Sequence, residues 1–242
     1  MSPELRTENL SVYYRQAVAV NNLTITVPGG QVTGLVGPNG AGKSSTLLAI
    51  YGSVDSTGVV TYDGADLSKM SSVNRARQGI GIVPQGRQLF PRLSVKENLR
   101  VMAELVKAPS DAVDRAMDRF PILRRRARSL AGVLSGGEQQ MMVVARALMA
   151  SPHVLLLDEM ATGLAPIIVQ DLMATIKQLA TEESVAVLYA APEIGAVKDG
   201  IQRGYVMIRG QVVATAEQNG NELNEAYQSA MGVELAATTT TL

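Results

Sequence analysis

A glycine-rich stretch carries the strongest chemical pattern in the chain. Residues 37–44 read GPNGAGKS and match the phosphate-binding loop pattern, and they stand between an expected strand at 31–36 and an expected helix at 43–51. Glycines allow backbone N–H groups to turn toward phosphate oxygens, the Lys43 amine adds positive charge, and the Ser44 hydroxyl can ligate Mg²⁺. The residues predicted to bind phosphates are Gly37, Pro38, Asn39, Gly40, Ala41, Gly42, Lys43, Ser44 and Ser45.

Two carboxylates follow a short apolar stretch at residues 154–157. Such a stretch is typical of a strand that is covered on both faces. Asp158 and Glu159 are therefore expected at its carboxyl end, which is where open α/β sheets bind ligands. Asp158 suits a partner of Mg²⁺, directly or through water, and Glu159 suits the base that orients or deprotonates an attacking water.

A third motif, LSGGEQQ at residues 134–140, precedes this strand and opens an expected buried helix that ends at Ala150. Here the chain resembles the ATP-binding-cassette ATPases, whose signature motif it matches. A hydroxyl and N–H groups at a helix start can bind a γ-phosphate. The resemblance implies that this phosphate belongs to a nucleotide held by a second ATPase subunit, in a homodimer or a heterodimer. The residues implied are Ser135, Gly136, Gly137 and Glu138.

The resemblance extends over nearly the whole chain and implies ATP and Mg²⁺ as cofactors. Tyr14 matches the aromatic residue that stacks on adenine, although the adjacent Tyr13 could take that role. Gln85 matches the glutamine that ligates Mg²⁺ and the attacking water, and it marks the start of a helical subdomain. Residues 162–166 lie where the family has a loop that bridges the dimer.

The elements that must position these residues alternate between strands and helices. The patterns predict strands at 10–14, 23–27, 59–62, 80–83 and 185–189, a hairpin around Arg209-Gly210, and helices at 94–107, 110–119 and around 168–179. This alternation favours an α/β fold with a mainly parallel sheet. The resemblance makes it a phosphate-loop ATPase core with an N-terminal antiparallel β subdomain and an inserted helical subdomain.

The same reading gives the expected domain limits. A single ATPase domain is expected at residues 1–235, with the helical subdomain at about 86–150 inserted in it. Residues 236–242, which include four consecutive threonines, are expected to form a disordered tail.

Composition excludes several classes of protein. The 22 lysines and arginines balance 22 aspartates and glutamates, so the chain lacks the basic character of a nucleic-acid-binding protein. Cysteine is absent, which rules out disulfides and Cys-ligated zinc and fits a cytoplasmic protein. The apolar runs are far shorter than the roughly 20 residues of a membrane-spanning helix, so we expect no direct membrane insertion.

Within the family, four segments look most like the second ATP-binding subunit of branched-chain amino acid importers: 84–87, 89–99, 163–166 and 203–206. The resemblance thus implies an ATP-hydrolysing subunit of an importer at the cytoplasmic face of the cell membrane, with transmembrane permease subunits as partners. Arg124, Arg125, Arg126 and Arg128 also fall where that subfamily is basic, and we interpret them as a solvated helical face.

Three features depart from the family pattern. Met160-Ala161 follows Glu159 where Pro-Ser is usual, so a helix-capping hydroxyl is missing. The sole histidine, His153, precedes the carboxylate strand and cannot serve as the family's switch histidine. Pro192 falls at the switch position, where it offers no side-chain donor. One alternative is therefore a nucleotide-gated partner subunit with weak hydrolysis. Another is a soluble DNA-maintenance or translation ATPase, but a chain of 242 residues with zero net charge leaves no room for the second cassette, coiled coil or basic extension that such proteins usually have.

Overall fold

The computed structural model describes residues 3–239, and its centre is a six-stranded sheet in the order β10-β9-β3-β8-β7-β6. Neighbouring strands are parallel except β9 and β10. This arrangement confirms the expected mainly parallel sheet and the hairpin. The strands are β3 (Val32–Val36), β6 (Ile80–Val83), β7 (Val154–Asp158), β8 (Ala186–Ala191), β9 (Arg203–Ile208) and β10 (Gln211–Ala216).

A second, antiparallel sheet lies in the N-terminal part, in the order β2-β1-β4-β5. The expected antiparallel pair is confirmed, but its strands are longer than the patterns suggested, because β1 already begins at Glu4. Polar residues alternate with the buried ones there, as in a sheet that is solvated on one face. The strands are β1 (Glu4–Tyr14), β2 (Ala17–Pro28), β4 (Ser56–Tyr62) and β5 (Ala65–Asp66).

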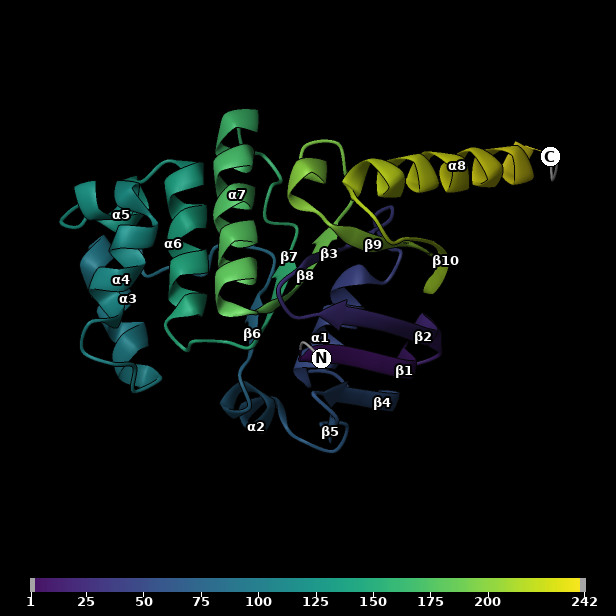
Figure 1. The fold of residues 1–242 in the computed structure, drawn as a ribbon, viewed down its shortest axis with the longest axis horizontal. Coiled ribbons are helices and arrows are strands. Elements are labelled where there is room, and N and C mark those ends of the chain that lie inside the picture. The colour runs from purple at the N-terminus through teal and green to yellow at the C-terminus, as the bar shows by residue number, and fades with distance from the viewer. Residues whose placement is uncertain (1–2, 240–242) are drawn as a thin grey trace.

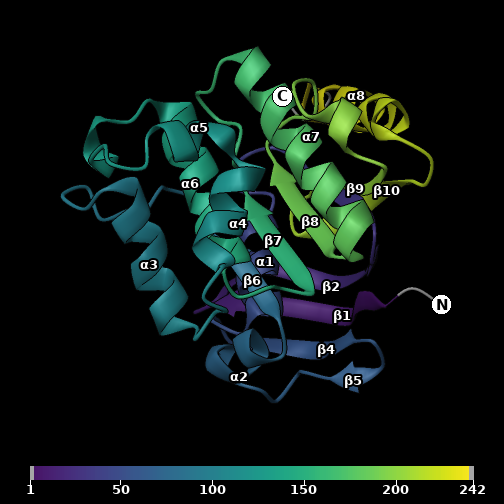
Figure 2. The same ribbon diagram turned by 60° about the vertical axis from the view of Figure 1, so that its left-hand side comes forward.

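Helices cover the parallel sheet, and some of them lie beyond it at one end of the molecule (Figure 1). The set α3–α6 follows β6 and precedes β7, and it gathers at one end of the molecule (Figure 2), as expected for the inserted helical region. The helices are α1 (Lys43–Tyr51), α2 (Ser72–Arg77), α3 (Val95–Leu105), α4 (Ala112–Arg119), α5 (Pro121–Arg125), α6 (Gly136–Leu148), α7 (Pro166–Glu183) and α8 (Gly220–Thr239), with 3₁₀ turns η1 (Ala131–Val133) and η2 (Lys198–Gly200).

Two hydrophobic cores form on opposite faces of the parallel sheet. Alternate residues of a strand point to opposite faces, so Leu155 and Leu157 pack with the helices α3–α7, whereas Leu156 packs with α1 and the antiparallel sheet. Every residue of β3, β7 and β8 is buried. The phosphate-loop helix α1 and the signature helix α6 therefore cover opposite faces of one rigid sheet.

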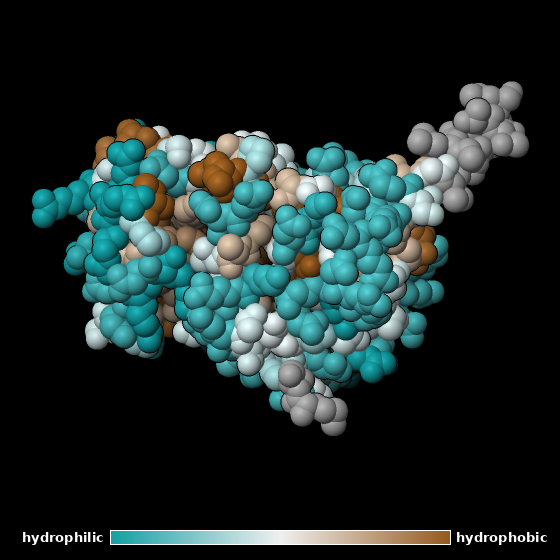
Figure 3. All heavy atoms as spheres, turned by 45° about the horizontal axis from the view of Figure 1, so that its top comes forward, coloured by the Kyte–Doolittle hydropathy of each residue, from teal (hydrophilic) through white to brown (hydrophobic). Residues whose placement is uncertain are grey.

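Three helices lie outside the expected helix ranges, namely α2, α5 and α8. Helix α8 runs through Thr239, so it carries helical structure into the segment 236–242 for which disorder was expected; residues 240–242 lie outside the described part. No helix of residues 3–239 is long and apolar enough to cross a membrane. On the face shown in Figure 3, apolar side chains appear as separate spots on a mostly hydrophilic surface.

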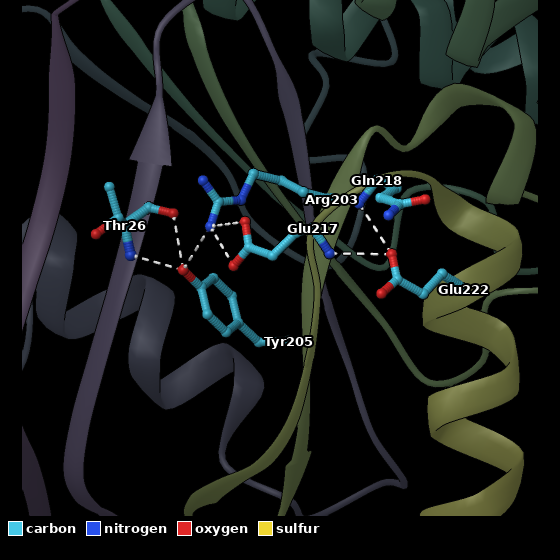
Figure 4. Close-up of polar contacts among 6 residues, drawn as sticks. All are labelled: Thr26, Arg203, Tyr205, Glu217, Gln218 and Glu222. Carbon is cyan, nitrogen blue, oxygen red and sulfur yellow. Dashed lines mark hydrogen bonds and ion pairs between the residues drawn. The ribbon is translucent and has the colours of Figure 1, made fainter.

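A polar network joins the two sheets to the start of α8 (Figure 4). The Tyr205 hydroxyl of β9 donates to the Thr26 carbonyl oxygen of β2 at 3.1 Å and accepts from the Thr26 amide at 3.0 Å. Arg203 pairs with Glu217 at 2.7 Å, and the Glu222 carboxylate accepts hydrogen bonds from the backbone of Glu217 and its neighbour. These contacts fix the antiparallel sheet, with its β1–β2 hairpin, against β9 of the central sheet.

A buried arginine closes the carboxyl end of α1. The Arg75 guanidinium donates to the carbonyl oxygens of Ala49 and Ile50 at 2.8 Å each, and to those of Met70 and Ser68 at 3.2 and 3.0 Å. Only 2% of Arg75 is exposed. The last carbonyl groups of a helix have no partner within the helix, so Arg75 supplies donors there together with the backbone amides of Gly52 and Ser53.

We predict that Arg75→Met lowers the free energy of unfolding by about 3 kcal/mol, because four carbonyl groups, two in buried and two in part-buried hydrogen bonds, lose a charged donor. Chemical denaturation measures the change. The matched control is Arg77→Met, since Arg77 is exposed and makes only a 3.4 Å hydrogen bond to Asn74. Equal stabilities of the two variants would contradict the assigned role of Arg75.

Candidate nucleotide site

The glycine-rich loop joins β3 to α1 at the carboxyl edge of the parallel sheet. Helix α1 begins after Gly42, and no side chain caps its N-terminus, so the first N–H groups remain available to a ligand. Gly42 has φ of 103°, and a Cβ atom there would lie 2.3 Å from the Ala19 carbonyl oxygen. A Cβ atom at Gly37 would lie 1.9 Å from the Met207 carbonyl oxygen. Both positions therefore require glycine for this loop shape.

The Lys43 amine lies inside this loop and is almost completely buried. It donates to the carbonyl oxygens of Gly37 at 2.8 Å and Pro38 at 3.1 Å, and it lies 3.7 Å from the Glu159 carboxylate. Burial lowers the pKa of Lys43, whereas the charges of Glu159 and Asp158 raise it. The lysine is thus a fixed cation whose present partners are a carboxylate and two carbonyls, all of which a phosphate group can replace.

Asp158 and Glu159 lie at the end of β7, where the sequence placed them. In the parallel register Asp158 lies opposite Ala190, and Val36 at the end of β3 lies opposite Ala191, so these strand ends meet at one edge. The Glu159 amide donates to the Ala190 carbonyl oxygen at 3.0 Å, and its φ of 50° lies in the left-handed region. This turn directs the carboxylate of Glu159 toward Lys43.

The Asp158 carboxylate fits a cation site. Its Oδ1 atom is buried without a hydrogen-bond partner among the described residues. Burial raises the pKa of Asp158, and the Ser44 hydroxyl and Lys43 oppose that shift. The described residues contain no group of three or more His, Cys, Asp or Glu side chains able to hold a metal. One carboxylate and one hydroxyl match the few protein ligands that Mg²⁺ takes when phosphate oxygens and water complete its shell.

Gln85 joins this cluster from the end of β6. Its Nε2 atom donates to Glu159 Oε2 at 3.1 Å, across 74 positions of the sequence. The structure therefore brings Gln85, Glu159, Asp158 and Lys43 together, although they come from the ends of two strands, β6 and β7, and from the start of α1. A carboxylate held between an amine and an amide is oriented by both, which suits a group that must bind one water molecule.

Tyr13 and Tyr14 lie at the end of β1 and are both about half exposed. The following strand β2 approaches the phosphate loop, because the Ala19 carbonyl oxygen lies against Gly42. The Asn21 amide of β2 also donates to the Gly210 carbonyl oxygen at 2.9 Å, and the Gly210 amide donates to the Ala41 carbonyl oxygen of the loop at 2.9 Å. The two tyrosines thus stand on a hairpin beside the loop. Either ring can offer a face to a base, so the choice between them stays open.

The signature residues are placed away from this cluster, at the start of α6. The Ser135 hydroxyl accepts from the Glu138 amide at 3.3 Å, and the Glu138 carboxylate accepts from the Ser135 amide at 2.8 Å. Arg126 donates to the same carboxylate at 3.0 Å. A Cβ atom at Gly136 would lie 2.8 Å from the Arg87 guanidinium, and one at Gly137 would lie 2.6 Å from the Ile168 side chain. None of these contacts joins the motif to the phosphate loop within residues 3–239.

The departures from the family pattern have structural counterparts. Met160 is buried and its sulfur accepts from Gln140 Nε2 of α6 at 2.8 Å, so an apolar side chain holds this loop. The N-cap of α7 is Ala165, without a side-chain hydrogen bond. The carbonyl oxygen of Pro192 accepts from the Tyr227 hydroxyl of α8 at 3.2 Å, and His153 stacks on a tyrosine ring at 6.1 Å, outside the cluster.

Sequence reasoning missed Arg126, which it assigned to a solvated face. The residue lies 12 positions before Glu138 in a loop after α5, so no helical spacing connects the two. The arginine cluster at residues 124–128 was the available signal. It lies shortly before the signature motif, whose carboxylate, Glu138, can pair with one of these arginines.

Comparison with known proteins gives a consistent answer. The family model for ABC transporters matches residues 20–162. A branched-chain amino acid transport ATP-binding protein, BraG of Pseudomonas aeruginosa, is 37% identical over 86% of this chain and 91% of its own length. A lipopolysaccharide export ATP-binding protein, LptB of Haemophilus influenzae, is 36% identical over 87% and 89%, and a probable LivF of Archaeoglobus fulgidus is 30% identical over 95% and 99%.

Solved structures agree with the sequence relatives. An ATP-binding cassette of an ABC transporter in its ADP conformation superposes with a TM-score of 0.86 at 26% identity, over 98% of this chain and 99% of that one. A nucleotide-free cassette gives a TM-score of 0.82 at 26% identity, over 92% and 94%. The chain therefore belongs to the ABC transporter family, as an ATP-binding-cassette ATPase.

Proposed function

We propose that this chain is the ATP-hydrolysing subunit of an importer that moves amino acids of the branched-chain type. The observation that carries the proposal is the joint position of Lys43, Gln85 and Glu159 at one sheet edge, which is an arrangement for cleaving a nucleoside triphosphate. The similarity to a branched-chain amino acid transport protein supports the choice of cargo. The similarity to lipopolysaccharide export proteins makes export the competing outcome.

The residues take distinct roles in this proposal. Glu159 accepts a proton from the attacking water, and Gln85 orients that water and helps to hold the metal. Lys43 and the loop amides bind the β- and γ-phosphates, while Tyr14 or Tyr13 stacks on adenine. Mg²⁺, when bound, neutralises the phosphate charge that develops. The proposed metal partners are Ser44, Gln85 and Asp158; the proposed phosphate contacts are residues 37–45, and residues 135–138 act on the opposing subunit's nucleotide.

A second ATPase subunit is part of the proposal because no contact within residues 3–239 joins the signature motif to this chain's own phosphate loop. Ser135 is exposed, and it lies on the face of the sheet opposite to α1. Two subunits that face each other head to tail let each signature motif reach the other's γ-phosphate. We also propose permease partners in the membrane, with this chain bound peripherally at the cytoplasmic face, and the helical region 86–150 as the part that receives the permease.

Reconstitution tests the cargo. The chain is affinity-purified with its membrane subunits from a native membrane, and the complex is placed in proteoliposomes with ATP on the side of the ATPase. ATP-dependent uptake of labelled leucine, isoleucine or valine supports the proposal. Failure of uptake together with ATP-dependent movement of lipopolysaccharide would overturn the importer assignment, although the ATPase assignment would stand.

Ser135→Arg is predicted to lower the ATPase rate of the assembled transporter more than Lys43→Ala does. The arginine places bulk where an opposing γ-phosphate must dock. Pro192 leaves this chain's own site without a switch donor, and a different partner ATPase with an intact switch histidine makes the site that Ser135 completes the faster one. The steady-state ATPase rates of both variants give the comparison. A larger loss from Lys43→Ala would mean that Gln85 and Glu159 suffice without a switch residue.

Ser94→Arg is the matched control for this substitution. Ser94 caps α3 through the same reciprocal arrangement that Ser135 makes with Glu138, its partner being Glu97. Loss of either cap costs about 1 kcal/mol of stability. Only Ser135→Arg should therefore reduce the ATPase rate strongly. Similar losses from both would assign the effect to helix capping.

A further inference from the structure

Glu138 puts a carboxylate into the signature motif, beside the place where the proposed function has the γ-phosphate of the opposing subunit bind. Glu138 occupies the first turn of α6, next to the exposed Ser135. An acidic side chain is favourable there for the helix, because its charge complements the helix dipole. It is unfavourable for an approaching γ-phosphate, because the two negative charges repel each other. Some feature of the structure must therefore offset the charge of Glu138.

Arg126 is that feature. The two carboxylate oxygens of Glu138 have different partners: Oε2 accepts from the Ser135 amide at 2.8 Å, and Oε1 accepts from Arg126 Nε at 3.0 Å. The Glu138 side chain is 13% exposed, whereas that of Arg126 is 54% exposed. Partial burial raises the pKa of Glu138, but the hydrogen bonds from Ser135 and Arg126 outweigh it and hold the pKa below its usual range. The carboxylate is thus ionised at neutral pH and paired.

Helix capping does not require this arginine, as α3 demonstrates. There Ser94 and Glu97 form the same capping box, with Glu97 Oε2 accepting from the Ser94 amide at 2.7 Å. Glu97 is exposed and has no ion pair among residues 3–239. The two boxes differ in the ion pair, because only the glutamate of the signature motif lies in contact with an arginine.

No other arginine of the basic cluster pairs with Glu138. Arg124 pairs with Asp118 at 2.6 Å and with Asp114 at 3.6 Å. Arg125 is exposed and makes no ion pair within the described part of the chain. Arg87, at the other side of the helix start, donates to the neutral amide of Gln139 at 2.7 Å. Arg126 alone among these guanidinium groups contacts the Glu138 carboxylate.

We infer that Arg126 is a positioning residue of the signature motif: it neutralises Glu138 and holds that carboxylate against the capping box. The Ser135 hydroxyl and the N–H groups of the first turn then meet the opposing γ-phosphate without a free negative charge beside them. The inference rests on the proposed contact between this motif and the nucleotide of a second subunit. Arg126 acts through Glu138 and does not itself touch the nucleotide.

A double-mutant cycle with Glu138→Gln tests the inference in the assembled transporter. Arg126→Ala should lower the steady-state ATPase rate about tenfold, since one uncompensated charge near a phosphate is worth that much at a protein surface. In the Glu138→Gln background the same substitution should change the rate less than about twofold, because no charge remains to be offset. A loss of equal size in both backgrounds would overturn the inference.

Two further variants separate charge from structure. Arg126→Lys keeps a cation and should retain most of the rate, and Arg125→Ala should leave it unchanged. Nucleotide binding to the isolated subunit should be the same in Arg126→Ala as in the wild type, because the phosphate loop is untouched. Equal rates for Arg125→Ala and Arg126→Ala would also contradict the assigned role.

The outcome can be told apart from a failure of the proposed function. If Ser135→Arg abolishes turnover and Arg126→Ala has no effect, the contact between subunits stands and the role of Arg126 is wrong. If neither substitution changes the rate, the signature motif does not meet a nucleotide, and the proposed function itself fails.

Discussion

Glu159→Gln is expected to lower steady-state ATP hydrolysis by about a hundredfold or more while ATP still binds, because general-base catalysis contributes at least that factor. Glutamine keeps an oxygen that can accept from Gln85, but its amide cannot take a proton from water at neutral pH. The wild-type carboxylate is already held by Gln85 at 3.1 Å and by Lys43 at 3.7 Å, so the substitution removes basicity from a prepared position.

Two measurements check this expectation. Phosphate release reports hydrolysis, and size-exclusion chromatography with MgATP reports whether the blocked variant accumulates as a dimer. Glu193→Gln is the control, because Glu193 is an exposed carboxylate that follows β8 and belongs to no part of the cluster. A monomeric Glu159→Gln variant with wild-type turnover would remove Glu159 from the reaction.

Lys43→Ala is expected to weaken ATP binding by about ten- to a hundredfold and to abolish hydrolysis at the site that contains this chain's own phosphate loop. A hydrogen bond from a charged donor is worth roughly 1.5–3 kcal/mol, and the Lys43 amine is the buried cation inside the loop. The backbone cradle survives, because Gly37 and Gly42 keep their conformations without the amine. What is lost is the positive charge that the β- and γ-phosphates require.

Titration with a fluorescent ATP analogue measures the affinity, and thermal unfolding of the nucleotide-free variant shows that the fold is intact. Lys198→Ala is a suitable control, because that lysine lies in η2, outside the nucleotide site. If affinity and hydrolysis were both unchanged in Lys43→Ala, the glycine-rich loop would have no part in nucleotide binding.

The predictable part of this molecule is local in sequence. The loop of eight residues between a strand and a helix is recognisable from its glycines, lysine and serine, and an apolar stretch followed by two carboxylates indicates a strand end, so the position of both could be predicted from the sequence alone. The Ser135 cap of α6 is of the same kind, since Glu138 three positions later completes the capping box.

The unpredicted part depends on pairs that are distant in sequence. The hydrogen bond between Gln85 and Glu159 spans 74 positions, and the ion pair between Arg126 and Glu138 joins a loop to a helix. In the sequence, Arg75 is one of several polar residues in a short segment. Nothing near it indicates that its guanidinium is buried and donates to the Ile50 carbonyl oxygen of α1, 25 positions earlier. Helix α8 was missed because its mixed polar and small residues give no strong periodic pattern.

The place of β3 in the sheet has a consequence for how the chain is made. All five residues of β3 are buried, and its two neighbours are β8 and β9, which follow it by about 150 residues. During synthesis on the ribosome this apolar strand emerges long before either neighbour exists, and the loop that follows it has no rigid support until β9 is complete. Non-local pairing of this kind slows folding and prolongs the exposure of apolar surface. Nascent chains that stop before β9 therefore lack a phosphate loop in its folded position. ATP in the cell cannot stabilise such chains by binding, so they remain exposed to chaperones and proteases.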